Sequence, residues 1–445
     1  MLSTASIFGI SAGSLFGGDY VQSLGPKKTI IIFNIFGLIG SIMSLQVSFK
    51  IMCLGRFFFG LTSGVLLCAT SRVLEDTIPA HLVDKGFGTS TNILMQVFTV
   101  VLLLTAIGMP DQKDKLETTL WWRIIYGLQI PFQVLVIILH LCIFKEETVK
   151  FCIQIGDKQQ ALRAIRKIYS KESEQTCEQI YEQCAASYHQ EVRESSRSHD
   201  SVWRTLTDPN LRKSTWMAIW VAVSNILSGV CLVNGFVILI FEKLNTYNLE
   251  HHGKMNKYTA KQDSYIVGFA NIFGAILSYY TIKIFSRRAI FVGGHILMGA
   301  ILGVSGYFVY MNQLELLLLS FCTFCAVYQA TQGSCLFIYV AEIVVNEVAM
   351  GLALFSLMLA MTIQSMFSTY MINCKCGLDV ILYLIGLFQL VPAVYFYFFM
   401  RETQGLNMQQ KKKLYITQSL KEEFEKLSIS SGQLEKGAAI KKKAL

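Results

Sequence analysis

The sequence predicts an all-α, polytopic membrane protein built from two helical bundles with a polar helical linker between them. Its 445 residues are 53% hydrophobic and only 16% charged, whereas about a quarter of the residues in soluble domains are charged. The hydrophobic residues gather in about eleven segments, each near the roughly 20 residues that a helix needs to cross a bilayer. One long polar stretch, at 145–212, separates the first five segments from the last six.

The first bundle is expected to fill residues 1–144. Its first segment is apolar and glycine-rich and lacks the basic residues that open a signal peptide, so we predict that it spans the membrane. Its last segment opens with Trp121, Trp122 and Arg123, a pattern typical of helices anchored at the lipid headgroups. The five predicted spans cover residues 7–20, 29–47, 51–74, 89–108 and 121–144.

The stretch at 145–212 is rich in Lys, Arg, Glu and Gln and is predicted to be a soluble, cytoplasmic helical linker. Within it, residues 149–169 repeat apolar side chains at helical spacing, and Gly156 interrupts the repeat. The apolar stripe predicted for this helix consists of Ile153, Ile155, Ala161, Leu162, Ile165 and Ile168.

The second bundle is expected at 213–400 and a basic cytoplasmic tail at 401–445. A polar loop at 242–262 is expected to cap one face of this bundle. The lysine runs of the tail, at 411–413 and 441–443, are expected to be solvated, and contact with anionic lipids is the alternative. The six predicted spans cover residues 214–241, 263–284, 289–311, 315–341, 350–372 and 380–400.

The basic residues predict the orientation of the chain. The net charge is +9, and most basic residues lie in loops, linker and tail, so we interpret them as orientation charges and expect no nucleic-acid partner. If every segment crosses the membrane, Lys27, Lys28, the linker, Arg287, Arg288 and the tail share one side, which is then cytoplasmic. We therefore expect a multi-pass protein of the plasma membrane or an internal membrane, with its C-terminus in the cytoplasm.

Two segments, one in each bundle, share a layout in which an apolar run starts at a glycine and closes on an acid. The first runs from Gly55 to Asp76, and the second from Gly333 to Glu342. An unpaired charge near lipid costs about 3 kcal/mol or more, so each acid needs a basic partner. The shared layout predicts a duplicated membrane protein, an organisation common among transporters.

Several short motifs, in the same order, resemble the sugar porter family of the major facilitator superfamily. The resemblance covers nearly the whole chain from the second helix of that fold onward, and the first helix of the family is expected to be absent. It implies the major facilitator fold and a transporter that moves a hexose or a related small polar solute by alternating access. The motifs are Gly55-Arg56-Phe57 with Gly60 and Gly64, Trp122-Arg123, Glu147-Thr148 with Lys150-Phe151 and Gly156, Gly333 with Glu342, and Glu402-Thr403-Gln404-Gly405.

The chain departs from the family pattern where that pattern carries function. Gln22, Ser23 and Pro26 stand in the loop after the second helix, where the family usually has an aspartate and arginines. The seventh-helix motif keeps one of its three amides, Asn225, and Phe337 stands where the family has a sugar-stacking tryptophan. These departures leave two alternatives open: a non-transporting sensor or scaffold, and a transporter of a non-sugar organic solute.

A sugar site needs amides, which both donate and accept hydrogen bonds, and an aromatic face for the ring. The resemblance places Asn271 at an eighth-helix asparagine of the family and Asn92 near its fifth-helix glutamine, with Gln96 as the competing assignment. Together with Asn225 and Phe337, these residues are predicted to bind the solute between the bundles. The alternative for each asparagine is a hydrogen bond between helices, worth about 0.6 kcal/mol.

Alternating access requires two states of similar energy, and in the resembling family ion pairs at the cytoplasmic ends of the helices hold one of them. The counterparts here are Asp76 and Lys85 in the first bundle, and Glu342 with Arg287 and Arg288 in the second. Because the usual loop residues after the second helix are missing, we expect the chain to open to the cytoplasm more often than a typical sugar porter.

Arg56 is predicted near the outer end of its helix, where proton-coupled relatives pair an arginine with an aspartate of the first helix. Without that aspartate, the sequence favours facilitative movement over proton symport. The loops show no nucleophile–base pair, phosphate-binding loop or metal-ligand spacing. We therefore expect no enzyme, catalytic residue, cofactor or metal site, and the expected partners are a small solute, above all a sugar, and the lipid bilayer.

Overall fold

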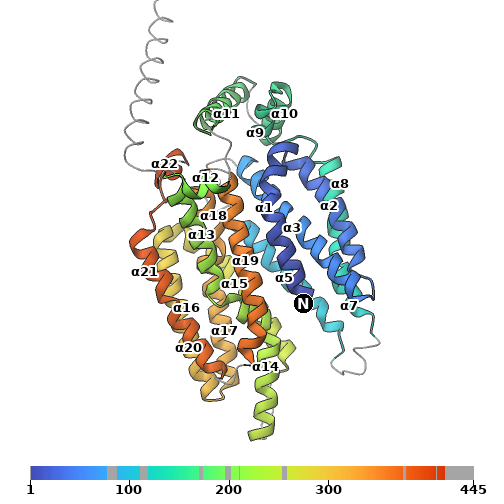
Figure 1. The fold of residues 1–445 in the computed structure, drawn as a ribbon, viewed down its shortest axis with the longest axis vertical. Coiled ribbons are helices and arrows are strands. Elements are labelled where there is room, and N and C mark those ends of the chain that lie inside the picture. Colours follow the sequence, from blue (N-terminus) through green and yellow to red (C-terminus); the bar gives the residue numbers. More distant parts are fainter. Residues whose placement is uncertain are drawn as a thin grey trace, which may run out of the picture.

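The chain folds into two helical bundles that stand side by side, with several short helices lying across one end (Figure 1). The computed structural model describes residues 2–77, 88–110, 119–169, 174–195, 202–209, 211–252, 258–345, 347–373, 377–406 and 408–415. Within these residues, ten helical segments are long and apolar enough to cross a membrane. Lys85 lies outside the described residues.

The first half of the protein contains the helices that precede the linker. Its first helix packs closely on its third, since a Cβ atom on Gly13 would lie 1.9 Å from the Leu61 backbone oxygen and one on Gly60 would lie 2.0 Å from that of Ser6. Such contacts between backbones require glycine at these positions. The helices are α1 (Leu2–Leu24), α2 (Pro26–Met43), α3 (Phe49–Thr77), α5 (Gly88–Thr105), the 3₁₀ turn η1 (Ala106–Gly108), α7 (Trp121–Gly127) and α8 (Gln129–Cys142).

Helix α1 is the predicted span that is not among the ten apolar segments. Its serines and glycines lower its hydropathy, but they face protein, because α1 lies between α3 and α19 (Glu347–Ile372). Ser11 and Ser14 are buried there, and their hydroxyls donate to the carbonyls of Ile7 and Ser11. A helix in this position needs less apolar surface than one that faces lipid.

The first three helices of the linker form a small domain with its own buried cluster, which includes Cys152, Ala161 and Ile165, whereas the fourth packs against the second half. Gly156 interrupts the first predicted helix with φ of 78°, as expected from its position in the sequence. Ile155 does not join the apolar stripe: its side chain is 56% exposed, because it caps the end of a helix beside the turn. The helices are α9 (Val149–Gln154), α10 (Lys158–Ile168), α11 (Glu174–Ser195) and α12 (Val202–Thr207).

The second half contains the helices from α13 onward, and three of its predicted spans are interrupted, one of them at Gln389 between α20 and α21. Gly229, with φ of 90°, separates α13 from α14, and a π-helical turn, η2, separates α17 from α18. The helices are α13 (Arg212–Leu227), α14 (Val230–His252), α15 (Ala260–Ile284), α16 (Arg287–Tyr310), α17 (Leu314–Tyr328), η2 (Gln329–Gly333), α18 (Ser334–Ile343), α19, α20 (Leu378–Phe388), α21 (Leu390–Phe399) and α22 (Met408–Lys413).

The prediction of a polar loop at 242–262 is wrong for its first part. Helix α14 continues to His252, well past the apolar residues that define the predicted span. Hydropathy reports where the lipid-facing surface ends, but a helix extends as long as its residues favour helical structure. Lys243, near the start of this extension, connects α14 to the end of α19, since its Nζ donates to the Ile372 carbonyl at 2.6 Å.

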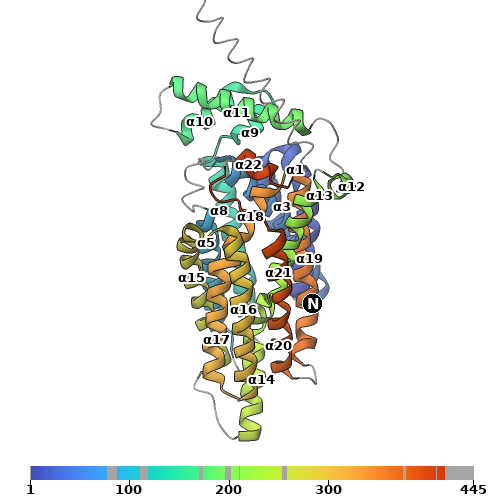
Figure 2. The same cartoon turned by 90° about the vertical axis from the view of Figure 1, so that its left-hand side faces the viewer.

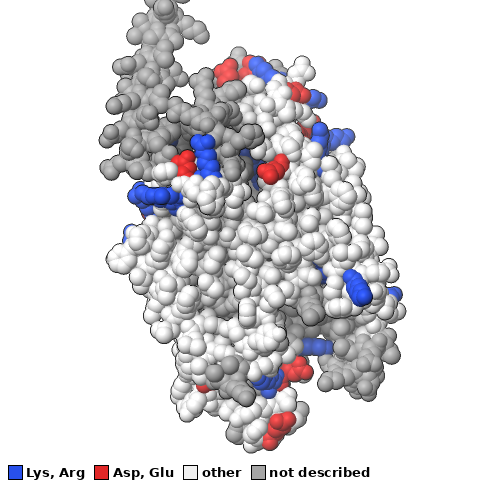
Figure 3. Space-filling view, viewed as in Figure 1, with Lys and Arg blue, Asp and Glu red and all other residues white. Residues whose placement is uncertain are grey.

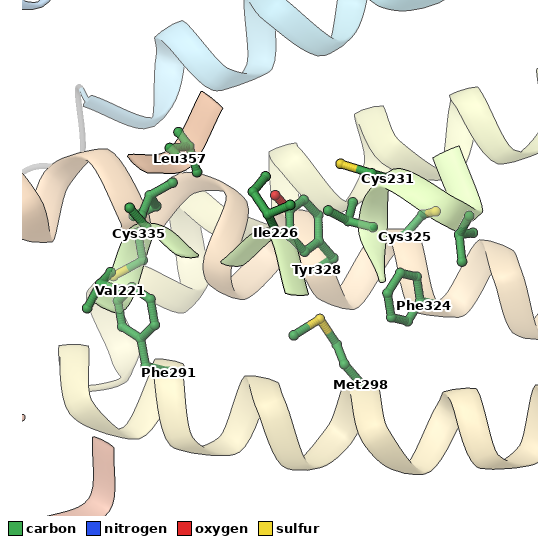
Figure 4. Packing of buried hydrophobic residues seen from close by; sticks show 14 of the residues in the cluster. Val221, Ile226, Cys231, Phe291, Met298, Phe324, Cys325, Tyr328, Cys335 and Leu357 are labelled. Atoms are coloured by element: carbon green, nitrogen blue, oxygen red, sulfur yellow. The ribbon is translucent and has the colours of Figure 1, made fainter. Parts of the chain in front are cut away.

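The main hydrophobic core lies in the second half and packs tightly at its centre. Figure 4 shows Met298 of α16 pointing towards Tyr328 of α17, and Phe291 of α16 beside Val221 of α13, with Leu357 of α19 on the other side. Phe324 fills the space further along α17. This core packs the helices of the second half against one another.

The two halves meet along two pairs of helices, α1 with α19 and α5 with α15, and α5 also contacts α18. The linker helices and α22 lie at one end of the bundles, which we call the linker face, and the opposite end is the far face (Figures 1 and 2). Charged side chains gather towards these ends, and the broad surface between them is almost uncharged (Figure 3). This surface is the one expected to contact lipid.

Candidate functional site

A chain of amide side chains crosses the contact between the two halves at the middle of the bundles. Asn92 of α5 donates from Nδ2 to Gln329 Oε1 at 3.2 Å and to Ser334 Oγ at 2.7 Å. Gln329 in turn donates from Nε2 to Asn271 Oδ1 at 3.1 Å, and Gln96 donates to Asn92 Oδ1 at 3.4 Å. The structure thus joins the predicted site residues Asn92, Gln96 and Asn271 in one network, which we call the amide network.

The amide network continues into the second half. Asn271 Nδ2 donates to Asn234 Oδ1 at 3.0 Å and to the Val267 carbonyl at 3.0 Å. The Cys325 thiol lies 3.1 Å from the same Asn234 oxygen. The residues of the network therefore come from α5, η2, α18, α15, α14 and α17, and amides that satisfy one another here could instead bond the hydroxyls of a sugar.

Asn225 and Phe337 are placed apart from the hydrogen bonds of the network. Asn225 is buried in α13 and accepts the Tyr328 hydroxyl at 2.8 Å, and Tyr328 directly precedes Gln329. Phe337 is 36% exposed and lies one helical turn beyond Ser334, on the side towards the linker face. Since residues three apart share a helix face, Phe337 faces the same side as the Ser334 hydroxyl that meets α5.

Three residues of the network were not predicted: Gln329, Ser334 and Asn234. Gln329 is the first residue of the π-helical turn η2, which hydropathy does not reveal. Asn234 sits in an apolar run beside Gly235, so an amide within a span was the available clue, whereas Asn225 was singled out by its family motif. Gln332 is fully buried, and neither its Nε2 nor its Oε1 has a partner among the described residues.

A second polar cluster surrounds Glu342 at the linker face. Its Oε1 lies 2.8 Å from Lys411 Nζ, and its Oε2 accepts the Thr403 hydroxyl at 2.5 Å. Arg287 Nε is 3.9 Å from Oε2. The expectation that the lysine run at 411–413 is solvated is therefore wrong for Lys411, which is 7% exposed, because α22 folds back onto the end of α18.

Helix α22 is held by further bonds around a buried tyrosine. The Tyr339 hydroxyl donates to the Arg401 carbonyl at 3.0 Å and lies 2.8 Å from the Tyr415 hydroxyl. Tyr415 is buried, and its oxygen accepts the Arg401 backbone N–H at 2.8 Å. Tyr339 thus supports the tail at the linker face and does not belong to the amide network.

Arg288 does not reach Glu342. Its backbone N–H donates to Glu402 Oε2 at 3.0 Å, and the Arg287 N–H donates to Glu402 Oε1 at 3.0 Å, so Glu402 caps the start of α16. The Arg288 guanidinium instead lies over the Tyr397 ring, 5.1 Å from its centroid. Burial acts to raise the pKa of Glu402, but the N–H donors of Arg288, Gln404 and Arg287 together hold it below its ordinary value.

The first half repeats this capping arrangement. Glu147, which follows α8, accepts the Lys27 backbone N–H at 2.7 Å at the start of α2, just as Glu402 follows α21 and caps α16. Glu147 is more deeply buried, and burial raises its pKa despite the nearby charge of Lys27. The two halves thus share this capping contact, as expected for a protein built from two related repeats.

The other predicted gating residues of the first half lie at its two ends. Asp76 Oδ2 is 3.5 Å from Arg72 Nε, one turn earlier on α3. Arg56 lies near the start of α3, with its guanidinium 5.0 Å from the centroid of the Tyr126 ring and 5.6 Å from that of Phe59. An aromatic pair therefore surrounds this arginine.

Two helical halves that meet at membrane depth around a polar network define a membrane transporter of the major facilitator fold. The structure is similar to that of the major facilitator proton:xylose symporter XylE bound to 6-bromo-6-deoxy-D-glucose, with a TM-score of 0.76 and 16% identity over 93% of this chain and 88% of that one. It is also similar to the inward-open conformation of the xylose transporter XylE from E. coli, with a TM-score of 0.69 and 15% identity over 94% of this chain and 88% of that one.

Sequence comparison agrees with the fold. The chain is 21% identical to sugar transport protein MST7 of Oryza sativa subsp. japonica over 90% of its own length and 77% of the relative. It is 22% identical to hexose transporter 1 of Toxoplasma gondii over 92% of its own length and 72% of the relative. The model of the family "Sugar (and other) transporter" matches residues 1–415, and the chain belongs to this family of membrane transporters.

Proposed function

We propose that this transporter moves a hexose or a closely related sugar by alternating access, with the amide network as its binding site. The observation that carries the proposal is the bond from Asn92 to Gln329 and on to Asn271, which joins side chains of both halves. A solute bound at this point contacts both moving bodies. Its binding can therefore favour one arrangement of the halves over another.

The chemistry of the network suits a neutral, hydroxyl-rich solute. Each amide carries donors and acceptors within a few ångströms of its neighbours, so a sugar hydroxyl can replace an amide–amide bond without leaving a buried group unpaired. Phe337 precedes Glu342 on α18 and offers an apolar face on the linker side of the network. The similar proteins of Oryza sativa and Toxoplasma gondii are named as sugar and hexose transporters, and XylE was described with a bound glucose analogue, which supports the same class of solute.

The Glu342 cluster is proposed as part of the gate at the linker face. Glu342 closes α18, the helix that also carries Ser334 of the network, so a shift of α18 during transport would strain the bonds to Lys411 and Thr403. Five further charged residues are proposed to shift the equilibrium between the outward-open and inward-open states. They are Arg56, Asp76, Lys85, Arg287 and Arg288. The linker face, with its basic residues, is proposed to be the cytoplasmic one.

The test is uptake of radiolabelled glucose into proteoliposomes that contain the protein or its Asn271→Ala variant. Losing the Asn271 amide removes its bonds to Gln329, Asn234 and the Val267 carbonyl at the centre of the site. We therefore expect apparent affinity to fall about tenfold or more. The control is Asn34→Ala, because Asn34 is a buried asparagine whose Nδ2 donates to the Ile30 carbonyl of its own helix at 2.7 Å.

Saturable uptake that is weakened by Asn271→Ala and kept by Asn34→Ala supports the proposed site. Equal uptake by all three proteins would place the sugar elsewhere. A protein that takes up neither glucose nor other sugars would instead favour a non-sugar solute or a non-transporting role.

A further inference from the structure

Gln329 uses both ends of its side-chain amide to join two of the amides that are proposed to bind the sugar. Its Oε1 accepts a hydrogen bond from Asn92 Nδ2 of the first half at 3.2 Å, and its Nε2 donates to Asn271 Oδ1 of the second half at 3.1 Å. Gln329 is 4% exposed. The two sugar-binding amides are therefore satisfied through a side chain of the protein itself, which lies between them.

The Gln329 amide has the hydrogen-bonding pattern of a sugar hydroxyl. A hydroxyl both donates and accepts, and Gln329 likewise accepts on the side of Asn92 and donates on the side of Asn271. Asn92 Nδ2 also donates to Ser334 Oγ at 2.7 Å. Gln329 and Ser334 thus offer α5 the acceptors that a bound sugar would otherwise supply.

A glycine gives the Gln329 side chain room to adopt this position. Gln329 opens the π-helical turn η2, and Gly333 closes it. A Cβ atom on Gly333 would lie 2.5 Å from Gln329 Oε1, well inside the distance of about 3.5 Å at which non-bonded atoms meet. Any larger residue at this position would therefore push the Gln329 amide away from Asn92.

The same turn carries a second glutamine that does not join the network. Gln332 is fully buried, and neither its Nε2 nor its Oε1 has a hydrogen-bond partner among the described residues. The presence of an amide in η2 is therefore not what connects the halves. The connection depends on the direction in which Gln329 points.

An alternating-access transporter crosses between its two open states both with and without its solute. As the halves close over the site, water leaves the polar groups between them, and a buried polar group without a hydrogen-bond partner is costly. On the loaded crossing, the sugar supplies the partners. On the empty crossing, the protein must supply them.

We propose that Gln329 takes the place of the sugar in the empty transporter and thereby speeds its return. The inference rests on the proposed sugar transport and adds a step to it. Sugar hydroxyls displace the Gln329 amide from Asn92 and Asn271 when sugar enters, and Gln329 restores both bonds when sugar leaves. Gln329 is thus a positioning residue for the empty crossing.

Comparison of net uptake with exchange tests the proposal, because the exchange of labelled for unlabelled sugar does not require the empty crossing. Proteoliposomes with the unaltered protein or Gln329→Leu are assayed for labelled glucose uptake, first without internal sugar and then with equal, saturating glucose on both sides. Leucine keeps an apolar side chain of similar size and removes the amide. We expect the ratio of net to exchange rate to fall about three- to tenfold, as the loss of one or two buried hydrogen bonds predicts.

Two further variants locate the effect. Gly333→Ala keeps the Gln329 amide but crowds it away from Asn92, so the ratio should fall here too, which also provides a test if Gln329→Leu does not fold. Gln332→Leu makes the same substitution on the same turn and is expected to leave the ratio unchanged. An unaltered ratio in Gln329→Leu overturns the proposal, and this includes an equal fall of both rates, the result expected for a bond that only stabilises the helices.

A labelling measurement without sugar separates this proposal from the proposed function. Phe337 lies one turn beyond Ser334 on α18, so Phe337→Cys reports how closely α18 and α5 stay together. In this background we expect Gln329→Leu, but not Gln332→Leu, to react several-fold faster with an impermeant thiol reagent supplied at the linker face.

The outcomes distinguish the two proposals. If the unaltered protein exchanges sugar but Gln329→Leu changes neither the ratio nor the labelling rate, the role of Gln329 is wrong and the proposed transport stands. If the unaltered protein neither takes up nor exchanges sugar, the proposed function is wrong and the return step is rejected with it.

Discussion

Two glutamates in equivalent places of the two halves have pKa values that are shifted in opposite directions. Glu402 receives N–H bonds from Arg287 and Arg288 and from its own loop, so the fold favours its ionised form. Glu147 has the Lys27 N–H at 2.7 Å but is more deeply buried, so the fold favours its neutral form. The same capping role therefore carries opposite electrostatic consequences in the two halves.

The difference predicts opposite effects of pH and of neutral substitution. The lowered pKa of Glu402 gives stability above the ordinary value of 4.5 that is lost as pH falls, whereas the raised pKa of Glu147 gives stability below 4.5 that is lost as pH rises. At neutral pH we expect Glu402→Gln to lower the melting temperature in detergent and Glu147→Gln to leave it unchanged or raise it.

Thermal unfolding of both variants between about pH 4 and 7 checks this expectation. The loss of melting temperature caused by Glu402→Gln should become smaller towards pH 4, because Glu402 in the unaltered protein is then being protonated. Equal losses for both variants at every pH would show that the two acids act only as hydrogen-bond acceptors.

At the scale of the helices, close backbone contact decides how α1 packs. The glycines that α1 presents to α3 leave room for backbone oxygens of the neighbouring helix, as at Gly13 and Leu61. Helix α1 also contacts α19 of the second half. Its packing on α3 therefore determines which face of the first half meets α19. Small residues here replace the bulky apolar side chains that lipid-facing spans carry.

We expect Gly13→Ala to destabilise the protein by about 1–3 kcal/mol or more, because the new Cβ must displace the Leu61 backbone oxygen. Gly303→Ala in α16 is the matched control, since no atom lies within 4 Å of its added Cβ, and alanine in a helix interior can gain up to about 1 kcal/mol. Thermal melting and the monodisperse fraction in detergent report the outcome. A tolerated Gly13→Ala would mean that α1 can shift away from α3 at little cost.

At the scale of the whole molecule, bonds between the halves lie at the centre and at the far face. Asn92 crosses at the centre, and Lys261 crosses to the Met109 carbonyl at the far face. The ion pairs formed between described residues each stay within the first half, the linker or the second half. That the protein opens more readily towards the linker face stays a prediction.

A cysteine at residue 337 measures this opening. Phe337 is 36% exposed and lies between the network and the linker face, so we expect Phe337→Cys to react several-fold faster with an impermeant thiol reagent supplied at the linker face than at the far face. The parent chain, treated in the same way, corrects for the native cysteines. Faster labelling from the far face would show that the protein rests in the opposite state.

Much of the fold and part of the site follow from the sequence alone. Apolar segments of membrane length, a polar linker and ordered family motifs are local properties, and they predicted the helical bundles, the linker and the sugar transporter family. The resemblance to the family singled out Asn92 and Asn271, because each stands at or near a position where the family has an amide. Neither hydropathy nor spacing reports how a helix is rotated, so Gln329 and Asn234 remained hidden.

Only the tertiary structure decided which polar groups meet. Glu342 needs a cation, as the sequence predicts, but the cation at 2.8 Å is Lys411, from a tail helix that local patterns place in solvent. The Arg288 side chain lies over the Tyr397 ring, and its backbone N–H donates to Glu402. The physical reason is that the sequence determines how costly each buried polar group is, whereas its partner depends on which helices pack together and at what rotation.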